Sequence, residues 1–327
     1  MSRAEFAILG AGAIGSILAA HLARAGHSVI VVARGERARA VARDGLRIKG
    51  LADFTVQVAV VTEPAQLQAA DTLIVATKTP GTEAALERLR HVRVGSALSI
   101  QNGVLKNELL ARAFGAERVL GALADTSGEL LPSGEVLFTR NVNLPLGELA
   151  GGITERARRI AGTIDQAGVR STAVADIVSQ EWSKFTVWLG LVSMAVTMRS
   201  VTWRYLADPD CAQVLVRLAR EVAAVARAQG IALVAGAAAL PLPTILEASE
   251  QDAIAAVLKS GEQMRSRAPE HRMSALQDLE AGRPLEVAET FGYAVGKARD
   301  LGLSLPLLES FHHVVAGIDR IRRAGTS

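Results

Sequence analysis

The sequence has few of the features on which secreted, membrane-spanning and nucleic-acid-binding proteins depend. Its 327 residues include one cysteine, Cys211, which excludes an internal disulfide and a cysteine-based zinc site and favours a reducing compartment. Phe, Trp and Tyr make up only 4% of the chain, and Lys and Arg are dispersed among acids with a net charge of +3. Without a dense basic run or many stacking aromatics, nucleic-acid binding is not expected.

Long hydrophobic runs are also absent. The longest, such as residues 187–196, are shorter than the roughly 20 residues that cross a bilayer, so no membrane span is expected. The first residues pass directly into an apolar, glycine-ended segment without the pattern of an export signal. We therefore expect a cytoplasmic protein without a metal centre.

The residues that are present, 50% of them hydrophobic, follow two patterns. In the first half, short apolar runs alternate with helix-like segments, which is typical of a parallel, doubly wound α/β sheet. These runs cover residues 4–9, 27–34, 71–78 and 97–103. Residues 133–149 alternate like antiparallel strands at a sheet edge, and the pattern is helical from about Ile177 onward. We expect an α/β domain over residues 1–172 and an all-helical domain over residues 173–327.

The first predicted strand leads into the motif GAGAIG, which consists of Gly10, Ala11, Gly12, Ala13, Ile14 and Gly15. A strand before the motif and a helix after it form the context in which G-x-G-x-x-G binds a dinucleotide. Gly10 permits a tight turn, Gly12 lets the backbone approach a pyrophosphate, and Gly15 allows close helix packing. The phosphates would lie at the amino end of the helix. The motif predicts a dinucleotide-binding domain of the Rossmann type.

The end of the second predicted strand indicates which dinucleotide is bound. An acid there would bind the ribose 2′-hydroxyl of NAD and repel a 2′-phosphate. Arg34 occupies that place, and a guanidinium can pair with a phosphate through two hydrogen bonds. Arg37 and Arg39 follow, and either could instead be a solvated helix residue, an interpretation that suits Arg39 better. Arg34 therefore predicts NADPH/NADP as the cofactor.

Lys78 and Asn102 come just after two other predicted strands. Because open α/β sheets bind ligands at the carboxyl ends of their strands, both are candidates to line the binding site. A polar residue after a strand is also ordinary loop chemistry.

Lys184 lies near the start of an otherwise apolar helix predicted over residues 180–198. Desolvating a lysine is costly, and the amino end of a helix disfavours a cation, so a functional role is indicated. The alternatives are that the side chain reaches solvent or pairs weakly with Glu181.

A second polar cluster lies in residues 273–295, around a Gly-Arg-Pro break. Ser274 and Asp278 share one helix face, and Glu286 opens the next predicted helix just after Pro284. Acids in a first helical turn are favoured in any case, so spacing alone does not choose Glu286 over Glu289.

Taken together, these segments resemble the ketopantoate reductase (2-dehydropantoate 2-reductase) family across essentially the whole chain. The matching segments, in order, are GAGAIG, Arg34, Thr77-Lys78, Asn102-Gly103, EWSK ending at Lys184, and SALQDLEAGRPLE from Ser274 to Glu286. The resemblance implies NADPH-dependent reduction of a 2-keto acid to a 2-hydroxy acid, as in pantothenate biosynthesis. It also implies a Rossmann domain, a helical domain and a homodimer.

The resemblance further assigns roles to individual residues. Lys184 matches the lysine that donates a proton to the carbonyl oxygen, and Glu286 matches the glutamate that contacts the substrate. Ser274 matches a substrate-binding serine. Lys78 and Asn102 match residues that line the cofactor and substrate site, with Asn102 contacting both ligands.

Two departures from the family pattern concern the substrate. Trp188 and Val192 stand where the family commonly has asparagines, and LEVA at residues 285–288 replaces the usual TEID. An indole and a valine in place of hydrogen-bonding groups favour a bulkier or more apolar keto acid, since each lost polar contact shifts discrimination by roughly 1–3 kcal/mol. The alternatives are therefore a family member that acts on a different keto or hydroxy acid, or a non-catalytic sensor of NADPH.

Overall fold

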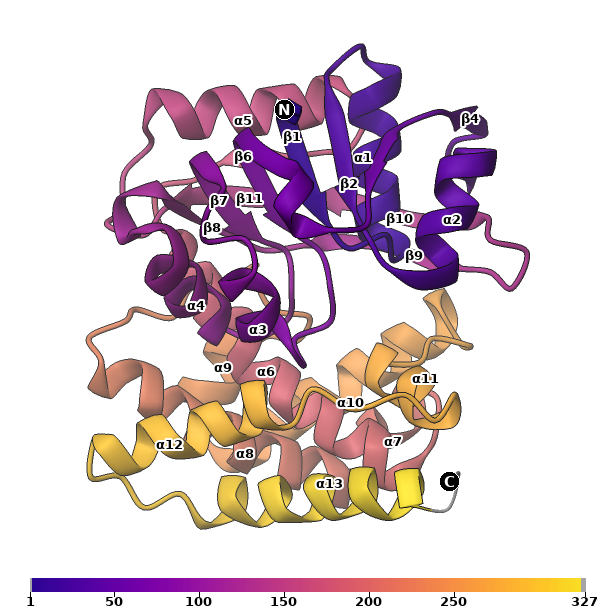
Figure 1. The fold of residues 1–327 in the computed structure, drawn as a ribbon. Coiled ribbons are helices and arrows are strands. Elements are labelled where there is room, and N and C mark those ends of the chain that lie inside the picture. Colours follow the sequence, from indigo (N-terminus) through magenta and orange to yellow (C-terminus); the bar gives the residue numbers. More distant parts are fainter. Residues whose placement is uncertain (1, 325–327) are drawn as a thin grey trace. The chain divides into compact units, whose positions relative to one another are not determined.

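The structure is a computed structural model that describes residues 2–324, and these fall into two compact units. The α/β unit runs up to Asn102 and from Lys106 to Val178. The helical unit continues from Ser179 and also includes Gly103–Leu105. Figure 1 shows the elements of both units. Residues 1 and 325–327, which belong to the two expected domains, lie outside the described residues.

The α/β unit is built on an eight-stranded sheet with the order β12-β11-β8-β7-β6-β1-β2-β5. Its strands are β1 (Ser2–Leu9), β2 (Val29–Val32), β5 (Ala59–Val61), β6 (Leu67–Val75), β7 (Arg93–Ser99), β8 (Val119–Ala122), β11 (Pro145–Glu148) and β12 (Thr172–Ala173). From β5 to β8 all neighbours are parallel, and β11 is antiparallel to β8. The expected doubly wound sheet is confirmed.

The strand order reverses direction beside β1. The chain moves from β1 through β2 to β5 on one side, and then returns to β6 on the other side of β1. Ala7 at the middle of β1 faces Ile30 of β2 and Leu73 of β6 in the two parallel ladders. Such a switch point is where open α/β sheets bind ligands, outside the carboxyl ends of the strands.

A second sheet of four strands, with the order β4-β3-β10-β9, was not anticipated from the sequence. It consists of β3 (Leu46–Gly50), β4 (Phe54–Val56), β9 (Asp125–Leu130) and β10 (Val136–Asn143). The antiparallel pairing expected over residues 133–149 is present, but in two sheets: β10 pairs with β9 and β11 with β8. The expected position at a sheet edge is wrong, because β10 also pairs in parallel with β3 and β11 with β12, so both strands are interior.

The helices of the α/β unit are α1 (Ala13–Arg24), α2 (Gly35–Asp44), α3 (Thr82–Glu87), α4 (Leu105–Phe114) and α5 (Glu155–Gln166). The short turns η1 (Pro64–Gln66) and η2 (Ala116–Arg118) are 3₁₀ helices. Helix α1 contacts the strands of both sheets and also α5. Its apolar residues Ile17, Leu18 and Leu22 are fully buried in the core that results.

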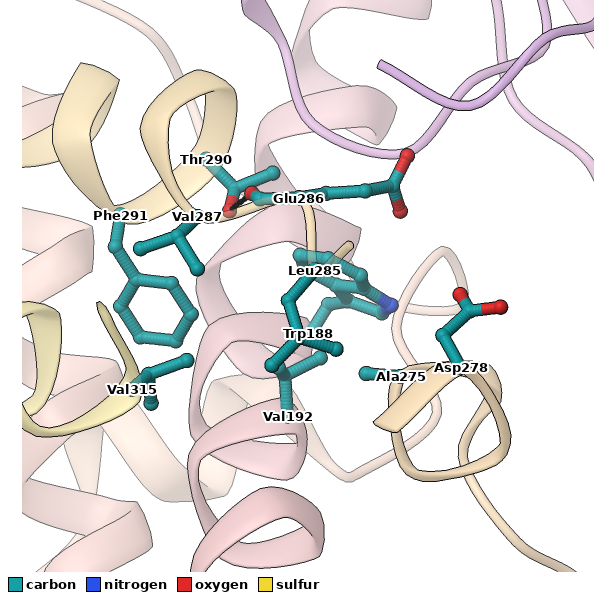
Figure 2. A pocket seen from close by; sticks show the side chains of 10 residues that line it. All are labelled: Trp188, Val192, Ala275, Asp278, Leu285, Glu286, Val287, Thr290, Phe291 and Val315. Atoms are coloured by element: carbon teal, nitrogen blue, oxygen red, sulfur yellow. Dashed lines mark hydrogen bonds between the residues drawn. The ribbon is translucent and has the colours of Figure 1, made fainter. Parts of the chain in front are cut away.

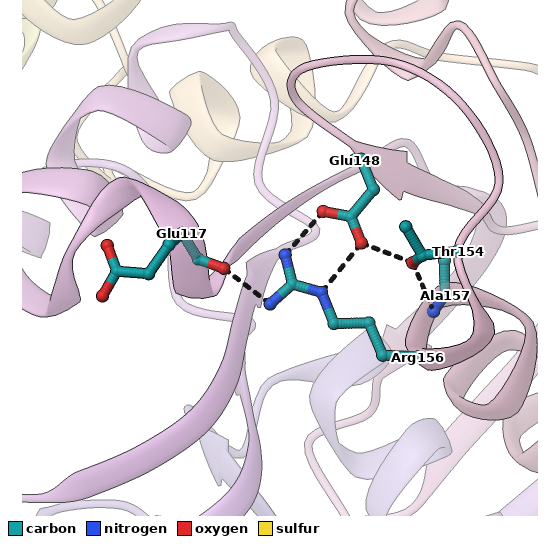
Figure 3. A network of polar contacts seen from close by, with 5 residues as sticks. All are labelled: Glu117, Glu148, Thr154, Arg156 and Ala157. Carbon is teal, nitrogen blue, oxygen red and sulfur yellow. Dashed lines mark hydrogen bonds and ion pairs between the residues drawn. The ribbon is translucent and has the colours of Figure 1, made fainter.

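A paired arginine and glutamate join three elements of this unit (Figure 3). Arg156 on α5 donates to both carboxylate oxygens of Glu148 on β11, at 2.8 and 2.5 Å, and to the Glu117 carbonyl of η2 at 2.6 Å. Thr154, the N-cap of α5, also donates to Glu148 at 2.5 Å. The hydrogen bond from Arg156 lowers the pKa of Glu148. This bidentate pair fixes the start of α5 against the sheet.

The helical unit contains α6 (Ile177–Met198), α7 (Thr202–Leu206), α8 (Pro209–Ala228), α9 (Leu242–Glu247), α10 (Glu250–Arg267), α11 (Ser274–Glu280), the π-helical turn η3 (Ala288–Gly292), α12 (Tyr293–Asp300) and α13 (Pro306–Ala324). Most of α6 is buried on every side, as its apolar sequence predicts. Its buried hydroxyls are satisfied within the helix: Thr186 donates to the Trp182 carbonyl and Ser193 to the Leu189 carbonyl, both at 2.8 Å.

The division between the units lies after Val178, whereas the sequence placed the domain boundary after residue 172. The intervening residues stay with the sheet because β12 pairs with β11 and the Val174 N–H donates to the Leu146 carbonyl at 2.9 Å. No helix within residues 2–324 is both long and apolar enough to span a membrane.

The α/β core contains one buried histidine. His21 on α1 lies edge-on to Phe54 and Phe138, with ring centroids 5.1 and 5.5 Å away. Its Nδ1 donates to the Ala167 carbonyl at 3.0 Å, while within residues 2–324 its buried Nε2 has no hydrogen-bond partner. Burial lowers the pKa of His21 from its usual value, with a smaller lowering from Arg24, so the folded state favours the neutral ring.

We expect the free energy of unfolding to fall as the pH is lowered from about 7 to about 5. Because the folded-state pKa of His21 is lowered, the unfolded chain takes up its proton first, at a pKa near 6.5, and the loss is at most about 1.4 kcal/mol per pH unit. Denaturant titrations across this range measure the effect. His21→Leu should flatten the dependence, and an equally steep fall in that variant would contradict the assignment.

Candidate functional site

In the α/β unit, the glycines of GAGAIG bring the loop after β1 against the loop after β6. Gly10 has a φ of 108°, and a Cβ there would lie 2.8 Å from Cγ2 of Thr77. A Cβ at Gly15 would overlap the Gly10 carbonyl oxygen and lie 2.9 Å from the Cβ of Ala76. Both positions therefore require glycine for close packing.

Gly12 differs from the other two glycines, because a Cβ at this position would meet no atom within 4 Å. It is exposed, is the N-cap of α1 and has no side chain to occupy the space at the amino end of that helix. An open space beside helix N–H groups suits a pyrophosphate. Ala11 precedes Gly12 in the loop, and Ala13 and Ile14 are the first two residues of α1. The residues present therefore fit the dinucleotide that the motif predicts.

The three arginines after β2 have different surroundings. Arg34 is exposed as the N-cap of α2, and Arg39 is exposed as a solvated helix residue would be. Arg37 fits neither interpretation made from the sequence. It is half-buried and donates to the Ala11 carbonyl at 3.0 Å, to the Gly134 carbonyl at 2.8 Å and to Ser16 Oγ at 3.1 Å.

Lys78 and Asn102 each lie three residues beyond the end of a strand, β6 and β7 respectively. Lys78 is exposed and Asn102 is half-buried. The loops that carry them are joined by the buried side chain of Gln101. Its amide donates to Thr77 Oγ1 at 3.1 Å, to the Lys78 carbonyl at 3.1 Å and to Thr82 Oγ1 at 2.7 Å, and its oxygen accepts from Ser99 at 2.9 Å. The two loops are thus held in one arrangement.

A buried lysine also contacts the segment that carries Gln101. The ammonium of Lys106, whose residue is 5% exposed, donates to the Gln101 carbonyl at 3.0 Å and to the Ala122 carbonyl at 2.5 Å. These carbonyls lie at the carboxyl ends of β7 and β8, and two such bonds help to offset the cost of burying the charge. Nothing in the sequence distinguishes Lys106 or Gln101 from ordinary loop residues.

The helical unit contains a small pocket that is partly open to solvent. It is lined by Trp188, Val192, Ala275, Asp278, Leu285, Glu286, Val287, Thr290, Phe291 and Val315. In Figure 2 the carboxylates of Glu286 and Asp278 project toward one side of the pocket, and the indole nitrogen of Trp188 points to that side. Val287, Phe291 and Val315 lie on the other side. The pocket thus combines an apolar wall with two acidic side chains.

The segment that carries Glu286 is tethered at several points. The Asp319 carboxylate accepts from the Leu285 N–H at 3.0 Å, and Thr290 Oγ1 donates to the Glu286 carbonyl. At the start of the segment, the Arg283 side chain donates to the Asp278 carboxylate at 2.7 Å. Glu286 itself lies two residues before the π-helical turn η3 and does not open a helix as the sequence suggested. Single π-turns often occur at functional sites.

The predicted substrate residues are only partly brought together. Trp188 and Glu286 both line the pocket, with Val192 one turn beyond Trp188. Lys184 is half-buried and is not among the residues that line the pocket. It lies on the same face of α6 as Trp188, one helical turn earlier, which is about 6 Å along the helix axis. Ser274 shares a face of α11 with Asp278 as predicted, but it is exposed and its neighbour Ala275 contributes to the lining.

Sequence reasoning also missed Asp319, for which a signal existed. Asp319 follows Val315 by four residues, so it lies on the apolar face of α13, where an acid needs a partner. Within residues 2–324, no group of three or more His, Cys, Asp or Glu side chains is arranged to hold a metal ion.

Comparisons with known proteins cover both units. The model of the family "Ketopantoate reductase PanE/ApbA" matches residues 6–151, and that of its C-terminal domain matches residues 176–319. A 2-dehydropantoate 2-reductase from Archaeoglobus fulgidus is 30% identical over 312 residues, covering 95% of this chain and 97% of that relative.

Two solved structures show the same fold. The ternary structure of D-mandelate dehydrogenase with NADH and anilino(oxo)acetate has a TM-score of 0.83 and 17% identity, covering 98% of this chain and 99% of that one. A dimeric ketopantoate reductase from Staphylococcus aureus has a TM-score of 0.72 and 20% identity, covering 97% and 99%. At these identities the likeness concerns the fold alone.

Asp319→Ala should lower the free energy of unfolding by about 1–3 kcal/mol, because it leaves the buried Leu285 N–H without its acceptor. Arg323→Ala is the matched control. It removes the Arg323 ion pair with Asp319 at 2.8 Å, but this arginine is half exposed, so the loss should stay below about 1 kcal/mol. Denaturant unfolding compares the two variants, and equal losses would contradict the anchoring role of Asp319.

Proposed function

The chain belongs to the ketopantoate reductase family, and on this basis we propose that it reduces a 2-keto acid resembling 2-dehydropantoate to the 2-hydroxy acid with NADPH. The oxidoreductase class follows from the family. The observation that carries the finer proposal is the pocket of the helical unit, in which Glu286 is held beside Trp188, one helical turn from Lys184.

The α/β unit would hold the cofactor. The backbone of Gly10–Gly15 would bind the pyrophosphate at the amino end of α1, and Arg34 would bind the 2′-phosphate. Lys78 and Asn102 would contribute from the two loops that Gln101 joins. When bound, NADPH would supply the hydride that reduces the carbonyl carbon.

The residues of this chain would supply the remaining chemistry. The Lys184 ammonium donates a proton to the carbonyl oxygen, which neutralises the charge that develops there. The Glu286 carboxylate accepts hydrogen bonds from the substrate and orients it, with its backbone fixed through Leu285 and Thr290. Ser274 and Asn102 would add substrate contacts, as the family pattern suggests.

A second candidate substrate class is favoured by the pocket lining. Trp188 and Val192 both face the pocket, together with Leu285, Val287 and Phe291. An apolar wall of this kind favours a keto acid with a branched or aromatic side chain, because a hydroxylated one would lose its hydrogen bonds there. The protein would then act outside pantothenate biosynthesis.

The proposal extends to the location, the assembly and the partners of the protein. We place the protein in the cytoplasm as a homodimer with a small-molecule substrate and without a nucleic-acid partner. The single cysteine and the dispersed basic residues support the location and the absence of a nucleic-acid role. The homodimer is proposed from membership of the ketopantoate reductase family.

Lys184→Ala should lower kcat/KM for keto-acid reduction by roughly 10²–10⁴-fold, the usual contribution of a general acid, while NADPH binding changes little. Lys184→Arg distinguishes the effect of the positive charge from that of proton donation, because a guanidinium keeps the charge but does not give up a proton near neutral pH. It should remain as impaired as the alanine variant. Steady-state rates and NADPH fluorescence titrations measure both quantities. If the unmodified protein turns over no keto acid in a broad panel but binds NADPH, it is a sensor.

Fluorescence titration should also show that NADPH binds more tightly than NADH. Arg34→Ala should weaken NADPH binding by about 1–3 kcal/mol, the value of a charge-assisted contact, and leave NADH binding unchanged. Arg39→Ala, at an exposed position on the same helix, is the control. Equal or tighter binding of NADH by the unmodified protein would contradict the assignment of NADPH as the cofactor.

A panel of keto acids distinguishes the two substrate classes. If the apolar wall selects the substrate, branched or aromatic keto acids should exceed 2-dehydropantoate in kcat/KM. Trp188→Asn should then shift the ratio toward 2-dehydropantoate by about 1–3 kcal/mol. Trp203→Asn, on α7 and outside the pocket lining, is the matched control. A preference for 2-dehydropantoate in the unmodified protein would rule out the second class.

A further inference from the structure

The hydrogen bonds of Arg37 are explained neither by binding of the cofactor 2′-phosphate nor by exposure of the side chain to solvent. Its three guanidinium nitrogens donate to three different segments. Nε reaches the Ala11 carbonyl of the glycine motif, Nη2 reaches Ser16 on α1, and Nη1 reaches the Gly134 carbonyl in the turn between β9 and β10. Every nitrogen of the side chain is thus engaged within the α/β unit.

The Ala11 carbonyl accepts two hydrogen bonds from this arrangement. One comes from Arg37 Nε at 3.0 Å and the other from Ser16 Oγ at 3.1 Å, and Ser16 Oγ in turn accepts from Arg37 Nη2. Ala11 and Ser16 are both buried. Two donors converging on one buried carbonyl hold the plane of the Ala11–Gly12 peptide in one orientation.

The orientation of that peptide decides where its other polar group points. Among residues 2–324 there are no cis peptide bonds, and in a planar trans peptide the N–H and C=O point in opposite directions. With the Ala11 carbonyl directed at Arg37, the N–H of Gly12, which is the N-cap of α1, is directed away from Arg37. Gly12 is the exposed residue beside which a Cβ would meet no atom within 4 Å.

The small sheet provides a firm support for Arg37. The turn that carries Gly134 is closed by hydrogen bonds between Leu131 and Glu135 and between Gly134 and Leu131. Arg47 on β3 donates to the neighbouring Ser133 carbonyl at 2.5 Å. The second sheet, which the sequence did not reveal, thereby fixes the turn against which Arg37 braces the glycine loop.

We propose that Arg37 is a positioning residue of the dinucleotide site, which orients the Ala11–Gly12 peptide so that the Gly12 N–H faces the pyrophosphate. This role rests on the proposed binding of a nicotinamide dinucleotide. It concerns the pyrophosphate, which NADPH and NADH share, and not the 2′-phosphate, which only NADPH carries. The two possible uses of an arginine at this place therefore differ in a measurable way.

The test is a fluorescence titration of both dinucleotides with four proteins: the unmodified chain, Arg37→Met, Arg34→Ala and the control Arg39→Met. Arg37→Met should raise the Kd of NADPH and of NADH by the same factor. We expect a rise of about 10-fold or more, which corresponds to the free energy that a hydrogen bond with a charged group contributes. Arg34→Ala should raise the Kd of NADPH alone, and Arg39→Met should change neither. Arg37→Lys should not restore binding, because one ammonium cannot replace a fork that reaches three segments.

Two results would overturn the role of Arg37. A rise in the Kd of NADPH alone would make Arg37 a ligand of the 2′-phosphate. A lower melting temperature with unchanged Kd values, measured well below that temperature, would make it a purely structural residue. If the unmodified chain binds neither dinucleotide, the cofactor assignment itself falls, and the role falls with it.

Should Arg37→Met fail to fold, Ser16→Ala provides the second variant. It removes one of the two donors to the Ala11 carbonyl and the acceptor of Arg37 Nη2 while leaving the guanidinium in place. A smaller but equal rise in both Kd values is expected. Unchanged values for both dinucleotides would overturn the proposal.

Discussion

The α/β unit depends on the close approach of two loops at the point where the strand order reverses. Gly10 leaves no room for a side chain against Thr77, and Gly15 leaves none against the Gly10 carbonyl. This approach is possible because β1 and β6 pair in parallel along their length, which brings the ends of both strands to one edge. Gln101 and Arg37 then hold the loops with side-chain hydrogen bonds.

The helical unit is organised around a second constraint, the burial of polar groups in apolar surroundings. On α6 the buried hydroxyls donate to carbonyls of their own helix. At the pocket, Asp319 accepts from the Leu285 backbone and Asp278 pairs with Arg283. Because an unpaired buried group costs more than a pair contributes, these contacts leave the segment around Glu286 little freedom. Its backbone position is therefore a result of packing and of several separate hydrogen bonds.

The parts that sequence reasoning predicted correctly are those with strong local patterns. The parallel strands and the apolar α6 follow from hydrophobic runs, and the tight turn at Gly10 follows from the glycine spacing. The four-stranded sheet was missed because β4 has only three residues and none of them is buried, so it carries no clear period. At the site, the sequence correctly predicted that Ser274 shares a face of α11 with Asp278. It did not predict that Ser274 is exposed and that its neighbour Ala275 lines the pocket.

By itself, the sequence determined that a doubly wound sheet carries a glycine-rich loop and that a helical unit follows, because these depend on patterns within a few residues of each other. It also determined the family, through short motifs that occur in a set order. Only the tertiary structure decided that Arg37 braces that loop, that Gln101 joins two others, and that Asp319 anchors the backbone beside Glu286. Each of these contacts joins residues 23 to 34 positions apart, and only the packing of elements decides which distant polar groups meet.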